Sequence, residues 1–421
     1  MKIKPYLLGT ITILALMPFS HSGCRSSTPA PRTGTPKAVF IIVDGIPWDV
    51  IEKLRPPVMM EIAGKEGFTR SYTGGGKGTW SESPTISAVG YNNLITGTWA
   101  AKHNVWNNDI AAPNYHYWSL FRLAETHDPS LTTAIFSTWL DNRTKLAGEG
   151  LEQTGRQVID IEVDGLEHDT INYPHDKGRK YLQRIDSAVT ASAAAAIRGR
   201  GPDLTWIYTE FTDDMGHMYG DSEQFHQAIY ETDRQIGKVW EAIQVRQAAT
   251  GEDWMIIITT DHGRDNKTGK HHGRQSDRER DTWMVTNAKD LNLRFRQTPA
   301  VVDIYPTIAR HLGLAIPEKV VNELDGVPLT GPVKVSDLTA TREGEKVVLN
   351  WRPYVNTGTV EILAATTDHF MTGGTDEYRT VGTAEVRAGK FDFTPDGPAE
   401  FLKILLVTGG QRINTRLLPV R

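Results

Sequence analysis

The chain has 421 residues, of which 39% are hydrophobic and 23% are charged, as in an ordinary globular protein. This length allows a large core and favours a division into two domains. The net charge of −5 includes no block of basic residues, which argues against a nucleic-acid partner.

The N-terminus has the pattern of an export signal. Lys2 and Lys4 precede a mostly apolar run from Tyr6 to Met17. This run is too short for a membrane span of about 20 residues, but it is typical of a signal peptide. The Ser-Gly-Cys triplet ending at Cys24 resembles a bacterial lipobox, although His21 stands where an aliphatic residue is usual. The alternative is an ordinary secretory signal with an incidental thiol.

Both interpretations predict an exported protein. Under the lipobox interpretation, residues 1–24 are the signal and lipobox, and a lipid on Cys24 anchors the protein to a bacterial envelope, facing the periplasm or the surface. Cys24 is the only cysteine, so the chain has no internal disulfide. Residues 25–36 are rich in Ser, Thr and Pro and are interpreted as a flexible tether.

Strand and helix patterns alternate between residues 37 and 330, which we predict to be one domain. Doubly buried strands are expected at 37–43 and 255–259, and further strands at 131–138 and 204–208. Helical periodicity begins near Pro47 and after Ser87, and it continues at 187–197, 225–243 and 303–314. This order predicts an α/β fold with a doubly wound, largely parallel sheet and helices on both faces.

The pattern changes at about Val335. Residues 347–351, 360–364 and 391–393 place apolar side chains at alternate positions, and turn residues separate these runs. We therefore predict that residues 335–421 form a small β-sandwich similar to a fibronectin type III module. Contact with the first domain and binding of carbohydrate or a surface are both open as its role.

Residues 74–79, Gly-Gly-Gly-Lys-Gly-Thr, invite comparison with a nucleotide-binding P-loop. A P-loop needs Ser or Thr directly after its Lys, and Gly78 stands there instead. No buried strand is predicted before this segment either. We interpret it as a mobile loop near the functional site.

Carboxylates and imidazoles follow three of the predicted strands. Asp44 follows the first, Asp213 and His217 lie in a loop after the strand at 204–208, and Asp261-His262 follows the strand at 255–259. Ligands of open α/β sheets gather at the carboxyl ends of the strands. Taken singly, each residue is also explained by a helix cap or a solvated turn.

Ser87 and the pair His271-His272 complete the set of candidates. Ser87 stands just before a predicted helix, where free amide groups and a positive field suit an oxygen nucleophile that attacks phosphate. A simple N-cap is the alternative for Ser87. The His pair lies in a Gly-rich, charged loop and offers further nitrogen donors for a metal.

The combination and order of these motifs resemble the alkaline phosphatase superfamily, and most of all its nucleotide pyrophosphatase/phosphodiesterase (type I phosphodiesterase) branch. The resemblance covers about residues 38–329 and makes 37–330 the catalytic domain. It implies that Asp213, His217 and His272 hold one divalent metal. His272 is chosen over His271 because it directly precedes a small residue, Gly273.

The resemblance implies that a second metal is held by Asp44, Asp261 and His262, with the oxygen of Ser87 completing its shell. Zinc suits this mixture of carboxylate and imidazole ligands. Ser87 would attack phosphorus and form a phosphoseryl intermediate that water then hydrolyses. The implied substrate is a small phosphorylated molecule.

Departures from the family pattern affect the expected substrate. Phosphodiesterase members commonly have Thr as nucleophile and Asn three residues later, where this chain has Ser87 and Gly90. Secreted phosphomonoesterases of the superfamily instead have a phosphate-contacting Asn about twenty positions on, and Asn108 falls there. Arg143 loosely matches a basic phosphate contact. Asn108 and Arg143 favour monoesters, but both are equally well explained as surface-loop residues.

Three other functions were compared. A sulfatase needs a modified residue in a Cys/Ser-x-Pro-x-Arg pattern, and Ser87-Ala-Val-Gly-Tyr91 lacks both the Pro and the Arg. A phosphotransferase of the same superfamily is an alternative enzyme. A non-catalytic surface lipoprotein or adhesin that retains a metal site is the alternative outside enzymes, although every ligand type is present.

Overall fold

The computed structural model describes residues 34–395 and 400–418. The predicted signal, the lipobox with Cys24 and most of the tether lie outside the described residues. From residue 34 onwards, the described chain belongs to one compact unit. Within it, no helix is long and apolar enough to cross a membrane.

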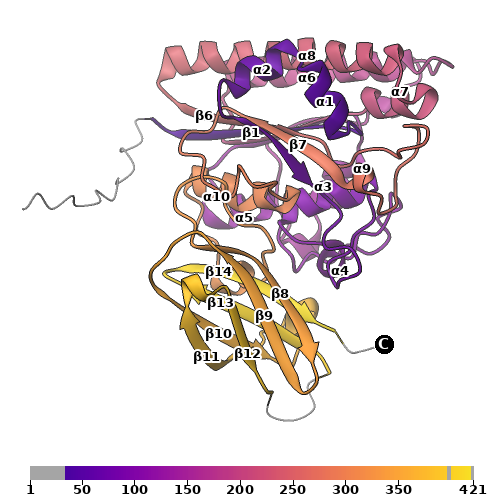
Figure 1. The fold of residues 1–421 in the computed structure, drawn as a ribbon. Helices are drawn as coiled ribbons and strands as arrows, with labels where there is room; N and C mark the ends of the chain where they lie inside the picture. The colour runs from indigo at the N-terminus through magenta and orange to yellow at the C-terminus, as the bar shows by residue number, and fades with distance from the viewer. Residues whose placement is uncertain (1–33, 396–399, 419–421) are drawn as a thin grey trace, which may run out of the picture. The chain divides into compact units, whose positions relative to one another are not determined.

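A seven-stranded sheet forms the centre of the N-terminal part (Figure 1). Its strands lie in the order β2-β7-β6-β1-β5-β3-β4, and the pairings among β6, β1, β5, β3 and β4 are parallel. At one side of the sheet, β7 pairs antiparallel with both β6 and the edge strand β2. The strands are β1 (Pro36–Val43), β2 (Phe68–Tyr72), β3 (Thr133–Ser137), β4 (Ile161–Val163), β5 (Leu204–Thr209), β6 (Asp253–Thr259) and β7 (Asp281–Thr286).

Helices cover both faces of this sheet (Figure 1). They are α1 (Trp48–Leu54), α2 (Pro57–Ala63), α3 (Ser87–Thr96), α4 (Ala100–His103), α5 (Leu120–His127), α6 (Lys180–Gly199), α7 (Phe211–Tyr219), α8 (Glu223–Thr250), α9 (Asp277–Arg280), α10 (Ile304–Leu312) and α11 (Glu318–Val321). The predicted α/β class, with a largely parallel sheet, is confirmed.

The central strand β1 shows why the chain forms two helical layers. Its residues 39, 41 and 43 join a buried cluster with α1, α2, α6 and α8, and residues 38, 40 and 42 join a second cluster with α3, α5 and α10. Alternate side chains of a strand point to opposite faces, so a continuous apolar run needs cover on both. Burial on both faces fixes β1 at the middle of the sheet.

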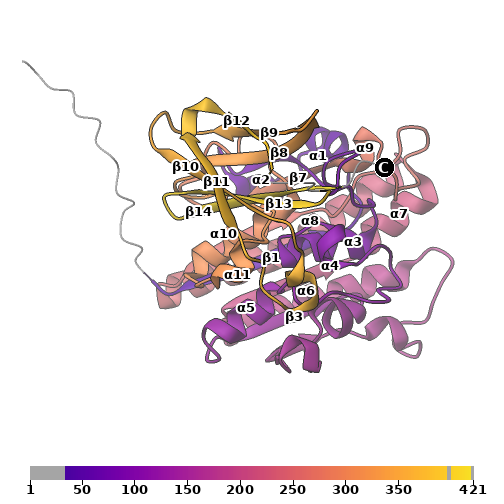
Figure 2. The same ribbon diagram turned by 90° about the horizontal axis from the view of Figure 1, so that it is seen from below.

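The C-terminal part consists of two antiparallel sheets, ordered β11-β10-β13-β14 and β12-β9-β8 (Figures 1 and 2). They share a hydrophobic cluster separate from those of the parallel sheet. The predicted sandwich strands are therefore present, while the boundary at residues 330–335 stays a prediction. The strands are β8 (Val335–Glu343), β9 (Lys346–Pro353), β10 (Thr359–Ala365), β11 (Arg379–Glu385), β12 (Lys390–Phe393), β13 (Leu402–Thr408) and β14 (Gln411–Leu417).

Buried ion pairs join these sheets to the α/β part. Lys102 is fully buried, and its Nζ lies 2.6 Å from Oδ1 of Asp325 and 2.8 Å from Oδ1 of Asn414 in β14. Lys403 of β13 pairs with Glu323. The Gly-rich segment at 74–79 leads to Trp80, whose Nε1 donates to Thr415. Of the two roles left open for the sandwich, contact with the first domain is present.

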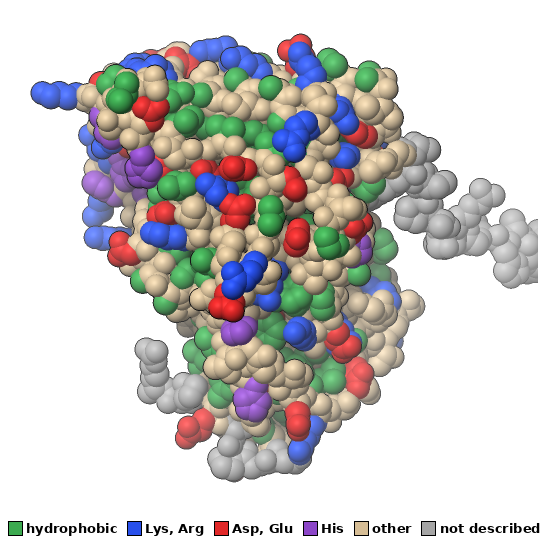
Figure 3. All heavy atoms as spheres, turned by 180° about the vertical axis from the view of Figure 1, so that it is seen from behind, with side chains coloured by type: hydrophobic (Ala, Val, Ile, Leu, Met, Phe, Trp, Pro, Cys, Tyr) green, Lys and Arg blue, Asp and Glu red, His purple; other side chains and the backbone are tan. Residues whose placement is uncertain are grey.

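Charges on the surface are mixed. On the face drawn in Figure 3, acidic and basic side chains lie interspersed with hydrophobic ones. This agrees with the small net charge of −5. The expectation of no nucleic-acid partner stays a prediction.

Candidate active site

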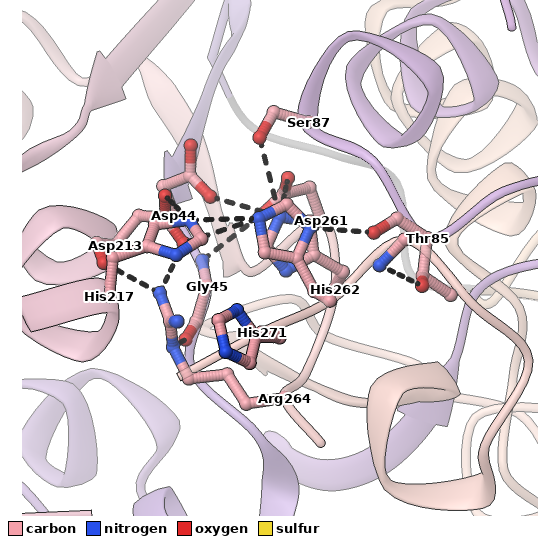
Figure 4. Close-up of polar contacts among 12 residues, drawn as sticks. Asp44, Gly45, Thr85, Ser87, Asp213, His217, Asp261, His262, Arg264 and His271 are labelled. Carbon is pink, nitrogen blue, oxygen red and sulfur yellow. Dashed lines mark hydrogen bonds and ion pairs between the residues drawn. The ribbon is translucent and has the colours of Figure 1, made fainter. Parts of the chain in front are cut away.

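Asp44, Asp261 and His262 meet at the carboxyl ends of two neighbouring strands, β1 and β6. The backbone N–H of Gly45 donates to Oδ1 of Asp261 at 3.2 Å, and that of Ile46 donates to Oγ1 of Thr260 at 3.0 Å. These bonds tie the two strand ends together. Nε2 of His262 lies 3.4 Å from Oδ1 of Asp44 and 3.2 Å from Oδ2 of Asp261 (Figure 4).

Asp213 and His217 lie on α7, so the prediction that they occupy a loop was wrong. Asp213 is in the first turn of this helix and His217 is in the last. Residues four apart in a helix share a face, and Nε2 of His217 lies 3.1 Å from Oδ2 of Asp213. The two side chains therefore lie together as expected, but on one face of a helix instead of in a loop.

His272 reaches the site from the segment after β6. Its Nε2 lies 3.1 Å from Nε2 of His217, and its ring stacks on that of His262 with centroids 3.7 Å apart. The Nδ1–H of His272 donates to the carbonyl of Thr85 at 2.8 Å. His271 is exposed, and its backbone N–H donates to Asp265.

Ser87 is the first residue of α3 rather than the residue before it. Its side chain is buried, and Oγ lies 3.3 Å from Nε2 of His262. Being in the first turn, the hydroxyl experiences the positive end of the helix dipole. Figure 4 shows Ser87 facing the strand-end carboxylates.

Two groups of side chains have donor atoms close enough to share a cation. One consists of Asp213, His262 and His272, and the other of Asp44, Asp261 and His262; within each group the donors lie within 4.8 Å of one another. His217 contacts Asp213 and His272 and so adjoins the first group. The structure thus brings together all seven residues expected to bind metal, with His262 between the two groups.

The donor atoms fit a bound cation. Oδ1 of Asp44 and Oδ2 of Asp261 are buried without a hydrogen-bond partner in the described part of the chain. A buried polar atom without a partner is costly, and a coordinated ion removes this cost. Nδ1 of His262 donates to the carbonyl of Gly263, as that of His272 does to the carbonyl of Thr85, so each Nε2 carries a lone pair on the side of the site.

The pKa shifts of the candidate ligands are also consistent with a site for a cation. Burial, followed by repulsion from Asp261 and Asp213, raises the pKa of Asp44, and burial with repulsion from Asp213 raises the pKa of Asp261. Burial lowers the pKa of His262 and of His272. A divalent cation favours ionised carboxylates and neutral imidazoles, so it would stabilise the ligand forms of all four groups.

A sequence model of the family described as type I phosphodiesterase/nucleotide pyrophosphatase matches residues 38–331. The match covers well over half of the chain. The chain belongs to the type I phosphodiesterase/nucleotide pyrophosphatase family. Membership of this family supports a phosphoester hydrolase or transferase of the alkaline phosphatase superfamily.

Similar solved structures include a protein of the alkaline phosphatase superfamily from Vibrio parahaemolyticus, with 12% identity over 78% of this chain and 76% of that chain and a TM-score of 0.48. Murine ectonucleotide pyrophosphatase/phosphodiesterase 5 has 13% identity, covering 67% and 96% of the two chains with a TM-score of 0.45. TAB5 alkaline phosphatase with bound Mg has 13% identity, 68% and 100% coverage and a TM-score of 0.44. No curated protein matches the sequence.

Two tyrosines that the sequence analysis missed hold Asp44 in this phosphodiesterase-family site. Tyr91 of α3 and Tyr208 of β5 both donate to Oδ2 of Asp44, the latter at 2.8 Å. Both phenols are buried, and burial raises their pKa values, so they remain donors at neutral pH. Asp44 therefore presents only Oδ1 to the site. The spacing of Tyr91 from Ser87, one helical turn, was the available signal.

The two residues suggested for phosphate binding have different surroundings. Asn108 lies beside the nucleophile, because its Oδ1 accepts from the N–H of Ala88 at 3.0 Å. Arg143 lies in the π-helical turn Asn142–Ala147 and pairs with Asp164 and Glu149. Within residues 34–395 and 400–418, no hydrogen bond or ion pair joins Arg143 to the other candidates.

Proposed function

We propose that the protein is a two-metal phosphoester hydrolase that works through a phosphoseryl intermediate on Ser87. The observation that carries this proposal is the position of the Ser87 hydroxyl, 3.3 Å from the imidazole that lies between the two groups of donor atoms. A nucleophile beside a pair of cation sites is the arrangement that in-line displacement at phosphorus requires.

Zinc is the proposed metal, because carboxylate and imidazole ligands suit it. Asp213, His217 and His272 would hold one ion, and Asp44, Asp261, His262 and the oxygen of Ser87 would hold the other. When bound, the pair of cations supplies electrostatic stabilisation of negative charge on the entering, leaving and equatorial oxygens. Hydrogen bonds from the protein hold Asp44, His262 and His272 in orientations that support this proposal.

The chain's own residues then account for two chemical steps. Oγ of Ser87 forms a bond to phosphorus while the bond from phosphorus to the ester oxygen breaks, and the alcohol leaves. Water then forms a bond to phosphorus and the Oγ–P bond breaks, which returns Ser87 and releases the phosphoryl product. The positive end of the α3 dipole, at Ser87, would stabilise negative charge on the phosphoryl oxygens.

Monoesters, diesters and nucleotide pyrophosphates are all substrates of the proposed class. The family favours diesters and nucleotide substrates. Asn108 favours monoesters, because a terminal phosphoryl group carries one more negative oxygen that needs a donor, and the amide of Asn108 lies next to Ala88. For Arg143, the two carboxylate partners reduce the charge available to a phosphate.

We also propose that the enzyme acts outside the cytoplasm as a lipoprotein anchored through Cys24. The supporting observations are the basic start, the apolar run and the Ser-Gly-Cys triplet near the N-terminus. Metabolic labelling with a fatty acid, compared between the full chain and Cys24→Ala, tests the anchor.

The function is tested by metal analysis together with rates on aryl phosphate monoesters, aryl phosphodiesters and nucleotide substrates in the presence of zinc. Ser87→Ala is expected to keep about two metals per chain and to lose turnover by about 10⁴-fold or more. The matched control is Ser119→Ala, which removes the serine that caps α5. It should lower stability by about 1 kcal/mol and leave turnover unchanged.

Full activity of Ser87→Ala would remove Ser87 from the mechanism. Bound metals without turnover of any phosphoester would favour the non-catalytic surface protein. Transfer of the phosphoryl group to an added alcohol in preference to water would favour the phosphotransferase.

A further inference from the structure

Arg264 follows the Asp261-His262-Gly263 sequence and lies beside the site, yet its side chain is completely buried. An arginine in a phosphoesterase site would ordinarily be assigned to phosphate binding. The contacts of this one point elsewhere. Nε donates to the carbonyl of Gly45 at 2.8 Å, and Nη1 to that of Lys270 at 3.3 Å. Nη2 donates to both the carbonyl and the carboxylate of Asp213.

These contacts make Arg264 a bridge between three segments that carry candidate metal ligands. Gly45 follows Asp44 at the end of β1, Asp213 lies in the first turn of α7, and Lys270 lies two residues before His272. The guanidinium carbon also lies 5.5 Å from the centre of the Phe225 ring on α8. Figure 4 shows the guanidinium directed at Asp213 and Gly45, while Ser87 lies on the opposite side of the site.

Two glycines provide the space that the guanidinium occupies. A Cβ on Gly216 would lie 2.2 Å from Nε and Cζ of Arg264, and a Cβ on Gly45 would lie 2.7 Å from its Nη2. Real Cβ atoms do not approach other atoms so closely. The glycines come from α7 and from the end of β1, so both elements leave room for the same buried cation.

The bond from Arg264 distinguishes the two oxygens of Asp213. Oδ1 accepts from the guanidinium and lies 4.0 Å from Nε2 of His272, while Oδ2 lies 3.1 Å from Nε2 of His217. In Asp44, Oδ2 similarly accepts from two donors, the neutral phenols of Tyr91 and Tyr208. In each carboxylate, one oxygen is therefore held by a side chain that is not a candidate metal ligand.

We propose that Arg264 is a positioning residue that fixes Asp213 as a one-oxygen ligand, and that it thereby sets the affinity of the Asp213/His217/His272 metal site. The proposal rests on the proposed two-metal function. It assigns to Arg264 no contact with phosphate.

Metal binding of the purified full chain provides the test. Zinc is titrated into chelator-treated wild type and Arg264→Met, with a chromophoric chelator as competitor and elemental analysis for stoichiometry. Partners that orient metal ligands typically contribute 10- to 100-fold in affinity. We expect the wild type to bind two zinc ions and Arg264→Met to bind one of them about 10- to 100-fold more weakly, with the other unchanged.

Arg264→Lys keeps the charge but cannot reach four acceptors at once, so we expect an intermediate loss at the same site. This variant decides the question if Arg264→Met fails to fold, as judged by circular dichroism. The matched control is Arg278→Met. Arg278 is another largely buried arginine, paired with Asp49 and Asp221 instead of a candidate ligand. It should lose stability while both zinc affinities stay unchanged.

The outcomes separate this inference from the proposed function. A wild type that binds no zinc would refute the two-metal function. A wild type with two tight sites, together with a folded Arg264 variant that keeps both at wild-type affinity, would refute the role of Arg264 alone. KM for an aryl phosphate, measured at saturating zinc, should stay within about 3-fold of wild type. A selective rise in KM would show that Arg264 binds phosphate after all.

Discussion

Gly90 of α3 lies directly against Asp261, so that a Cβ on Gly90 would be 2.7 Å from the Cβ of Asp261 and 2.8 Å from its carbonyl oxygen. This contact sets how closely the helix that begins with Ser87 approaches the strand end that carries two candidate ligands. It also gives a structural reason for a departure from the family pattern, in which Asn is common at this position. A larger side chain would displace either the helix or Asp261.

Gly90→Ala is therefore expected to move Ser87 away from His262. We expect stability to fall by about 1–3 kcal/mol, as in other overpacked cores, and turnover to fall by at least about 10-fold. Urea unfolding and initial rates measure the two effects. The control is Gly199→Ala at the end of α6, where a Cβ meets open space and stability should be unchanged or slightly higher. An unaffected Gly90→Ala would mean that the approach of α3 is adjustable.

Tyr91→Phe removes one of the two phenols on Asp44 while keeping the ring. With Tyr208 still donating to Asp44, we expect zinc affinity at the Asp44 site to fall by about 10-fold rather than vanish. Competition titration with zinc provides the measurement. Tyr305→Phe is the matched control, because the Tyr305 hydroxyl is buried without a partner among the described residues, so its removal should cost nothing.

Asn108→Asp separates two functions of one side chain. The carboxylate still accepts from the N–H of Ala88, but the amide donor is lost and a negative charge faces the phosphoryl group. We expect kcat/KM for an aryl phosphate monoester to fall by about 10- to 100-fold and that for an aryl diester to fall far less. Asn107→Asp is the control, because Oδ1 of Asn107 likewise accepts from a backbone N–H, that of Asp109. Equal losses on both substrates would contradict a monoester-specific contact.

His103 predicts a pH dependence of stability that is independent of the metals. Its Nδ1 accepts from the N–H of Val105 and its Nε2–H donates to Asn93, so the ring is held neutral. Burial lowers its pKa to about 3. Above about pH 6.5 the ring is neutral in both the folded and unfolded states and contributes no pH dependence. Below that pH the unfolded chain takes up a proton that the folded chain refuses, so stability falls until the folded pKa is reached.

Between pH 7 and 4.5, the wild type should therefore lose about 2–3 kcal/mol more of its unfolding free energy than His103→Gln does. Urea unfolding of both proteins in the presence of a chelator measures the difference. Parallel pH profiles would show that His103 is protonated in the folded protein.

Lys102→Met tests the buried ammonium of α4, which pairs with Asp325 of the α/β part and donates to Asn414 of β14. Without the ammonium, Asp325 becomes a buried carboxylate that has lost its cationic partner, which typically costs about 3–5 kcal/mol. Lys346→Met removes a similar pair with Asp392 at an exposed position, and we expect little change. Thermal unfolding compares the two. Equal effects would mean that the buried ammonium of Lys102 contributes little to stability.

The strand-end residues could be predicted because each follows a long apolar run that can only be a buried strand. Strands such as 36–43 and 253–259 force Asp44 and Asp261 to the same edge of the sheet, whatever the helices do. The resemblance to the alkaline phosphatase superfamily then rested on the types of these residues and on their order along the chain. This is why the fold class and the set of converging residues agree with the sequence.

Other features depend on contacts that a linear pattern does not show. Gly216 made the segment after β5 look like a loop, but the structure needs this glycine for the close approach of Arg264 within a helix. The strands β2 and β7, which add an antiparallel pair at one side of the sheet, are short and lack clear alternation, and they were not predicted. Tyr91 and Tyr208 contact Asp44, and Arg264 contacts Asp213. These partners are far apart in the sequence, so only the folded structure shows the contacts.

The central position of β1 has a consequence for biosynthesis. This first strand pairs with β5 and β6, and β6 follows it by more than two hundred residues. A nascent chain that has not emerged as far as Thr259 leaves β1 without its neighbour β6, and one that has not emerged as far as His272 lacks one of the converging side chains. Under the proposed two-metal function, capture of the cations therefore follows the synthesis and folding of nearly all of the α/β part, and the supply of the ions to the finished protein controls its activity.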